Sequence, residues 1–139
     1  MSWKDKCLAA LSAEHLFESP QHQTRFKELM DCYSDYPFFS RGLCKCMYLS
    51  AWDEEHFSIM LETLNDMVLG KERDTEDMRL RGDALAEEHT DAEYYVYELS
   101  GSFLSGEPYS PGRPANIPPE SRYIISRAMD ASRIIDKLT

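Results

Sequence analysis

The stretch that decides the fold is DEEHFSIMLETLNDMVLG, residues 53–70. Its apolar side chains recur at spacings of three and four, which is the period of an α-helix with one buried face. Asp53 precedes the run as an N-cap residue, and Gly70 follows it as a helix terminator. The pattern therefore predicts an amphipathic helix between these two residues. Its apolar stripe consists of Phe57, Met60, Leu61, Leu64, Met67 and Val68.

Two helices are predicted at the start of the chain, each with a capping signal. Ser2 followed by Asp5 resembles a capping box, which predicts a helix over residues 3–17. Ser19 as N-cap and Pro20 at the first helical position predict a second helix. The short connection between the two helices suits an antiparallel pair.

A third helix is predicted over residues 37–51, because the sequence Asp-Tyr-Pro at residues 35–37 repeats the signal of a cap followed by a proline. Apolar residues lie on more than one side of this helix. We therefore expect it to be buried around much of its girth. One side carries Phe39, Leu43, Cys46 and Met47, and another carries Cys44, Tyr48 and Ala51.

Three more elements are predicted in the second half of the chain. Residues 74–88 have a narrow apolar face typical of a peripheral helix, and a helix through residues 91–103 either follows it or continues it. Residues 105–119 hold five prolines, which cannot occupy a helix interior and predict a stiff loop. The last helix is predicted over residues 119–138, where apolar side chains fall within one narrow arc.

The fold class follows from these elements. No stretch of useful length alternates apolar and polar residues with the period of a β-strand. A chain of 139 residues is long enough to bury a core as one domain. The sequence therefore predicts a single all-α domain over residues 1–139, built as a bundle of six to seven helices with a proline-rich loop before the last one.

The formal charge of -10 is concentrated in the middle of the chain. Residues 53–98 hold fifteen acidic and four basic side chains, whereas residues 1–52 are balanced and residues 99–139 carry a net charge of +1. Phosphate backbones and anionic lipids attract clustered Lys and Arg, so we expect no direct partner among nucleic acids or membranes. The acidic segment 53–98 favours a protein partner with a basic surface.

No apolar run approaches the roughly 20 residues needed to cross a bilayer. The short apolar run at residues 7–13 lies between Asp5 and Glu14, which is unlike the core of a signal peptide. We therefore expect a cytoplasmic protein.

In a reducing compartment, cysteines are expected to be free thiols that pack as small buried hydrophobes. This expectation covers all four cysteines of the chain. Two of them are two residues apart in the third predicted helix, so they face opposite sides and cannot both bind one metal ion. The four are Cys7, Cys32, Cys44 and Cys46.

Three tyrosines occupy four positions of the predicted helix through residues 91–103. Tyr95 shares a face with the apolar Val96 and is expected to enter the core, whereas Tyr94 and Tyr97 project to the flanks among carboxylates. Tyrosine is enriched in interface hot spots, and carboxylates attract basic surfaces. We therefore predict a partner-binding site that consists of Glu87, Glu88, Asp91, Glu93, Tyr94, Tyr97 and Glu98.

Two features leave this prediction open. The proline-rich loop or the last helix could cover the tyrosine rings, and Arg122, Arg133 and Lys137 of the last helix could neutralise the acidic segment within the chain. The sequence PYSPGR at residues 108–113 also matches the P-x-x-P-x-R pattern of SH3 ligands, although an internal strap across the helices is the simpler interpretation.

No catalytic or metal-binding signature stands out in the sequence. It lacks a Glu-x-x-His motif, a second cysteine pair, a G-x-S-x-G elbow and a glycine-rich phosphate loop. We therefore predict no catalytic residue, no cofactor and no metal. A small helical enzyme or metalloprotein that uses His56 and His89 with neighbouring carboxylates is the alternative.

The function predicted from the sequence is non-enzymatic protein binding. Small acidic helical proteins can occupy the basic channel of a nucleic-acid enzyme, with carboxylates in the place of phosphates. The classes that fit this description are phage anti-defence inhibitors, including anti-CRISPR-like proteins, and toxin antidotes or immunity proteins. A homodimer or scaffold subunit, in which the tyrosine face meets its own copy, is a third class.

Overall fold

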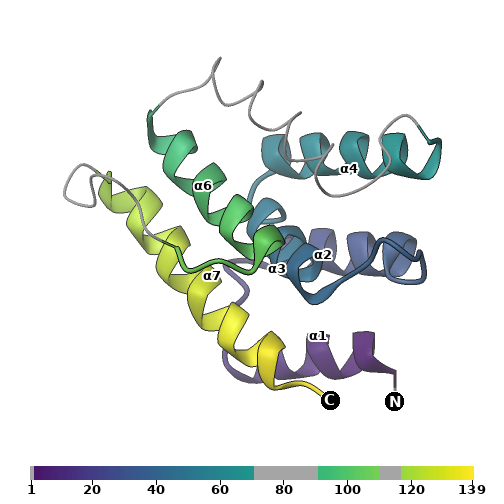
Figure 1. Cartoon of the computed structure of the whole chain (residues 1–139). Coiled ribbons are helices and arrows are strands. Elements are labelled where there is room, and N and C mark those ends of the chain that lie inside the picture. Colours follow the sequence, from purple (N-terminus) through teal and green to yellow (C-terminus); the bar gives the residue numbers. More distant parts are fainter. Residues whose placement is uncertain (1, 71–90, 110–116) are drawn as a thin grey trace.

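The computed structural model describes residues 2–70, 91–109 and 117–139, with only the backbone for residues 91–94. The described residues form helices and no strand, so the all-α prediction is confirmed. None of these helices is both long and apolar enough to cross a membrane. The helices are α1 (Trp3–Ala13), α2 (Pro20–Tyr33), α3 (Arg41–Ser50), α4 (Glu54–Val68), α6 (Asp91–Ser105) and α7 (Pro119–Lys137) (Figure 1). The fifth predicted helix, over residues 74–88, lies outside the described residues.

The predicted N-caps of α1, α2 and α4 are confirmed. The hydroxyl of Ser2 accepts a hydrogen bond from a backbone N–H three residues on, at 3.1 Å. Ser19 caps α2 in the same way at 3.0 Å, and Pro20 is the first residue of that helix. The Asp53 carboxylate accepts the His56 N–H at 2.8 Å at the start of α4. Each cap satisfies a backbone donor that the helix itself leaves without a partner.

The predicted end of α1 at residue 17 is wrong, because the helix ends at Ala13. His15 adopts a left-handed conformation with φ of 55°, and its N–H bonds to the Ser12 carbonyl at 3.0 Å. The Leu16 N–H bonds to the Leu11 carbonyl, also at 3.0 Å, and both leucine side chains are buried. This pair of hydrogen bonds is a Schellman motif, which most often uses glycine at the left-handed position.

The predicted start of α3 at residue 37 is also wrong, because Ser40 is the N-cap and accepts the Leu43 N–H at 3.1 Å. The residue before a proline is disfavoured in the helical region, which keeps Tyr36 out of a helix. The Tyr36 and Phe38 rings instead stack at 5.3 Å between ring centres. Residues 35–39 therefore form a turn that carries aromatic side chains.

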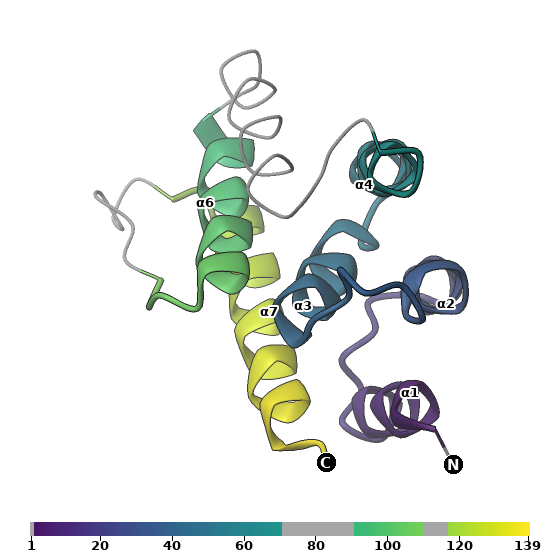
Figure 2. The same ribbon diagram turned by 45° about the vertical axis from the view of Figure 1, so that its right-hand side comes forward.

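Helix α3 occupies the centre of the structure. It packs against α6 and α7 on one side and against α2 and α4 on the other (Figures 1 and 2). Six of its ten residues are buried, which confirms the expectation that this helix is covered around much of its girth. Helices α4 and α6 therefore lie on opposite sides of α3 (Figure 2).

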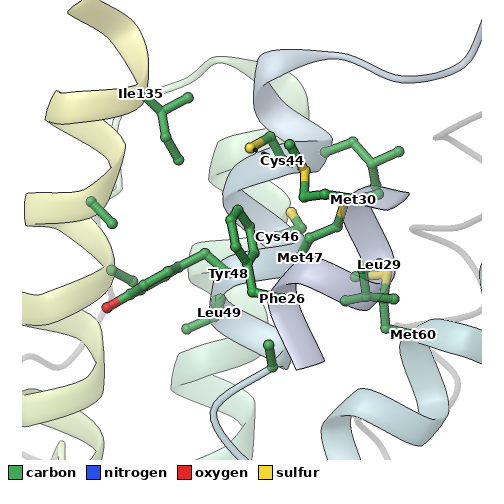
Figure 3. Close-up of a cluster of buried hydrophobic side chains, with 14 of the residues drawn as sticks. Phe26, Leu29, Met30, Cys44, Cys46, Met47, Tyr48, Leu49, Met60 and Ile135 are labelled. Atoms are coloured by element: carbon green, nitrogen blue, oxygen red, sulfur yellow. Dashed lines mark hydrogen bonds between the residues drawn. The ribbon is translucent and has the colours of Figure 1, made fainter. Parts of the chain in front are cut away.

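The core around α3 is rich in sulfur and aromatic side chains. Figure 3 shows Phe26, Leu29 and Met30 of α2 beside Met47 of α3, with Ile135 of α7 on the far side of that helix. Methionine and cysteine fill irregular gaps between helices because their side chains are small or flexible and polarisable. The buried apolar residues of the six described helices belong to one cluster.

The cysteines are all free, but only three are buried. Cys44 faces Cys7 of α1, and Cys46 donates its S–H to the Ser100 carbonyl of α6 at 3.4 Å, so the two thiols of α3 do point to opposite sides. The expectation that Cys32 is buried is wrong, because this thiol is exposed on α2. It lies between the buried residues Met30 and Tyr33 in sequence but on the outer face of the helix.

Helices α3 and α6 approach each other closely at Gly42. A Cβ atom on Gly42 would lie 2.4 Å from the carbonyl oxygen of Phe103, which is far inside van der Waals contact. The obstacle is helix backbone and cannot rotate away as a side chain can. Glycine at this position therefore sets how near α6 lies to the central helix.

We expect Gly42→Ala to lower the free energy of unfolding by about 2 kcal/mol, because α6 must move away from α3. Gly101→Ala is the matched control. Gly101 lies within α6, and a Cβ atom there would meet no other atom within 4 Å, so alanine should raise stability by up to about 1 kcal/mol. Urea unfolding of both variants measures the difference, and equal effects would contradict the close approach.

Candidate functional site

Five of the seven predicted partner-binding residues have no described side chain. Glu87 and Glu88 lie outside the described residues. Asp91, Glu93 and Tyr94 belong to the first turn of α6, where the structure describes the backbone alone. Their helical placement agrees with the sequence prediction, and their role in binding stays a prediction.

The other two predicted residues, Tyr97 and Glu98, are half-buried on α6. The same helix buries Val96 and Leu99 against the core, at 4% and 1% exposure. Tyr95, which we expected in the core, is half-buried and packs against its edge. Each of the two predicted residues therefore keeps part of its side chain accessible beside a buried face.

The start of the proline-rich loop contacts this helix. The Tyr109 hydroxyl donates a hydrogen bond to the backbone carbonyl of Tyr95 at 3.1 Å. Burial raises the pKa of Tyr109 to about 12, so the phenol keeps its proton at neutral pH and remains a donor. The middle of the loop, residues 110–116, lies outside the described residues, so its predicted role as a strap stays a prediction.

Helix α4 carries the best-described part of the acidic segment. Its sequence holds no Lys or Arg. Glu54, Glu55 and Glu62 are exposed on its outer side, while Met60 and Leu64 are buried on its inner side. The first two acids lie in the first turn, where the helix dipole favours negative charge. Within the described part of the chain, no cation pairs with either of them.

Two exposed apolar side chains lie at the C-terminal end of α4. Val68 and Leu69 have 39% and 69% of their surface exposed. Val68 was predicted to belong to the buried stripe, and that part of the prediction is wrong because the core contacts of α4 end one residue earlier, at Met67. The outer side of α4 therefore combines carboxylates with an apolar end.

His56, one of the two histidines of the alternative hypothesis, lies beside the N-cap of α4. Its Nδ1 atom is 2.7 Å from both carboxylate oxygens of Asp53, and its ring lies 4.6 Å from the Trp52 ring. Burial alone would raise the pKa of Asp53, but the hydrogen bonds from His56 outweigh it and lower the pKa. This geometry holds the cap in place.

No metal site accompanies this histidine in the described residues. Among residues 2–70, 91–109 and 117–139, no three side chains of His, Cys, Asp or Glu form a group that could hold a metal ion. His89, the other histidine of the alternative hypothesis, lies outside them.

Two arginines are bound to backbone carbonyls at the ends of helices. Arg25 donates to the Ala51 and Trp52 carbonyls at 2.7 and 2.8 Å, where α3 ends. Arg41 donates to carbonyls at the end of α7, including that of Ile135 at 2.7 Å. These side chains join helix ends, because the last carbonyls of a helix have no partner within the helix.

Other cations of the described chain pair with acids outside the segment 53–98. Arg127 contacts Glu18 at 2.9 Å. Arg133, which the sequence suggested as a partner of the acidic segment, contacts Asp130 of its own helix instead. Arg127 and Arg133 are thus paired outside α4.

A groove with a volume of about 220 Å³ lies between α3, α6 and α7. Leu99, Phe103 and Tyr109 line it, and Lys45 and Arg133 supply positive charge. Both cations are already paired with acids of α7, in the case of Lys45 with Asp136 at 2.7 Å. The groove was not predicted from the sequence, because its walls come from three separate helices.

The one buried histidine in the described residues has a structural role. His22 is 1% exposed, its Nδ1 accepts the Glu18 N–H at 3.0 Å, and its Nε2–H donates to the Tyr48 carbonyl at 2.9 Å. Both ring nitrogens are thus satisfied in the neutral form. Burial is the main cause that lowers the pKa of His22.

Comparisons with protein-family models, with curated proteins and with solved structures find no match to this chain.

The charge on α4 can be tested by replacing Glu54 and Glu55 with glutamine. We expect this variant to elute from an anion-exchange column at clearly lower salt than Glu28→Gln/Glu120→Gln, which removes the same charge from exposed sites on α2 and α7. The reason is that ion exchangers sense clustered accessible charge more than net charge. Equal elution of the two variants would mean that α4 is not a concentrated acidic surface.

The depressed pKa of His22 predicts a stability loss in mild acid. The unfolded chain binds a proton on His22 below about pH 6.5, whereas the folded chain resists it, so stability is present above that pH and is lost below it. We expect the melting temperature of His22→Gln to fall less than that of the wild type between about pH 7 and about pH 5. An equal fall in the two proteins would contradict the structural role of His22.

Proposed function

We propose that this protein is a non-catalytic binding protein whose acidic segment, residues 53–98, docks on a basic surface of another protein. The class of partner that fits best is an enzyme with a nucleic-acid channel. In that channel, carboxylates of this chain would stand where phosphates lie. The protein would then act as an inhibitor, of the kind formed by toxin antidotes, immunity proteins and anti-defence proteins.

The observation that carries this proposal is the outer side of α4. Glu54, Glu55 and Glu62 are exposed there, and the helix has no Lys or Arg. The whole segment 53–98 holds fifteen acidic side chains. Carboxylates at this density repel one another and lower the stability of the fold, and solubility alone does not require so many of them. A cationic partner would offset the repulsion.

The distribution of cations supports the same proposal. Two arginines of the described residues contact other groups: Arg41 donates to the Ile135 carbonyl at the end of α7, and Arg127 pairs with Glu18. Their positions are fixed by hydrogen bonds to backbone carbonyls or by partly buried ion pairs. These two cations therefore do not pair with Glu54 or Glu55 of α4.

Apolar side chains beside the carboxylates would strengthen the binding of a partner that the carboxylates attract. Charged groups mainly speed association, whereas buried apolar and aromatic side chains mainly slow dissociation. Val68 and Leu69 supply exposed apolar surface at the end of α4, and Tyr97 is half-buried on α6. We include Val68 and Leu69 in the proposed docking surface on α4, and Tyr97 in the part of the acidic segment that α6 carries.

Charge reversal at Glu87, Glu88 and Glu93 should slow association with the partner and flatten its salt dependence, by tenfold or more in rate at low salt. Tyr97→Ala should leave the association rate nearly unchanged and speed dissociation. Both effects are measured by surface plasmon resonance against the protein that is captured from the native host extract. Unchanged kinetics in both variants would contradict the proposal.

Two measurements on the purified protein separate the other functional classes. Size-exclusion chromatography with light scattering detects a homodimer, and its abolition by Tyr97→Ala would favour the scaffold class. Elemental analysis detects a bound metal, and a stoichiometric metal ion would favour the enzyme or metalloprotein class with His56 and His89. A monomer without metal that binds its partner through residues 53–98 is the expected result.

A further inference from the structure

Three sulfur atoms meet in the core where α1, α2 and α3 pack together. The Sγ atoms of Cys7 on α1 and Cys44 on α3 are 3.8 Å apart, and both side chains are fully buried. Cys44 also contacts the Met30 sulfur of α2 at 3.9 Å. Figure 3 shows Cys44 and Met30 side by side in the core. Two thiols from separate helices are thus in direct contact.

The two thiols are not equivalent. The hydrogen bond from Cys44 lowers the pKa of Cys7, and the same bond, together with burial, raises the pKa of Cys44. Of the two thiols, Cys7 is therefore the one that ionises more readily. A thiolate beside a thiol is the arrangement from which a disulfide forms, because only the thiolate is a strong nucleophile.

Access to this pair depends on α1. This helix buries only two of its eleven residues, Cys7 and Leu11. Few buried contacts mean that a helix opens locally at a lower free energy than the whole protein unfolds. A small movement of α1 relative to α3 would admit a small oxidant to both thiols.

We propose that Cys7 and Cys44 form an oxidation site at which a peroxide converts the two thiols into a disulfide that ties α1 to α3. The Cys7 thiolate attacks one peroxide oxygen, the O–O bond breaks, and hydroxide leaves and takes up a proton. The Cys44 sulfur then attacks the resulting sulfenic acid, the S–O bond breaks, and the hydroxyl group leaves as water with the Cys44 proton. Two thiols are oxidised, and hydrogen peroxide is reduced to two waters.

The other two cysteines do not compete for this role. Cys46 lies on the opposite side of α3, where burial raises its pKa to about 12 and keeps it protonated. Cys32 is exposed on α2 and has no cysteine in contact among the described residues. The two sulfurs of a disulfide are about 2 Å apart. The Sγ atoms of Cys7 and Cys44 must therefore move about 2 Å closer to each other for the bond to form.

The experiment treats the full chain carrying Cys32→Ser with hydrogen peroxide, because this exposed thiol could link two molecules. We expect the protein to lose the mass of two hydrogen atoms, and peptide mapping to find Cys7 joined to Cys44. Cys46 should be alkylated as a free thiol after denaturation. The melting temperature should rise by about 10 °C, because the bond restrains the unfolded chain, and dithiothreitol should reverse the rise.

The matched controls are Cys46→Ser and Cys44→Ser in the same background. The first should keep the peroxide-dependent shift and the second should lose it. A disulfide that includes Cys46, or Cys7 and Cys44 recovered as free or over-oxidised thiols, would overturn the proposal. The peptide map of the Cys32→Ser protein gives this answer even if Cys44→Ser does not fold, and none of these outcomes depends on the acidic surface.

Discussion

The burial of α3 on several sides is the constraint on which the rest of the structure depends. A ten-residue helix with six buried residues needs neighbours around it, and α2, α4, α6 and α7 supply them. Gly42 allows α6 to approach the first turn of α3 without a steric clash. Because α3 separates α4 from α6, the acidic segment begins on one side of the molecule and continues on the other.

In this arrangement, arginines bind the ends of helices, whereas glutamates of α4 lie on the surface. Arg25 and Arg41 lie where helices end, and they satisfy carbonyls that would otherwise lack partners. Glu54 and Glu55 lie on a helix whose inner side alone meets the core, so they face outward. The two arginines are thus held at helix ends, and the proposed binding function uses carboxylates that stay exposed on α4.

Much of the fold could be predicted, because helix period and N-caps are local signals that the sequence displays directly. The predicted end of α1 is wrong because His15 takes the left-handed position that usually holds glycine. The predicted start of α3 is wrong because Ser40 is the N-cap, although the proline signal before it indicates an earlier start. The acidic helix α4 could be foreseen from the lack of Lys and Arg in residues 53–70. The contact between Cys7 and Cys44 could not, because 37 residues separate them and only tertiary packing brings them together.

Cross-linking with a zero-length carbodiimide in the native host extract tests the central claim most directly, because the reagent joins a carboxylate only to an amine in contact with it. The ion pairs Lys4 with Asp31 and Lys45 with Asp136 serve as internal positive controls. The account predicts further links from carboxylates in residues 53–98 to lysines of one other protein. Links confined to this chain's own lysines, or spread evenly over all its exposed acids, would contradict it.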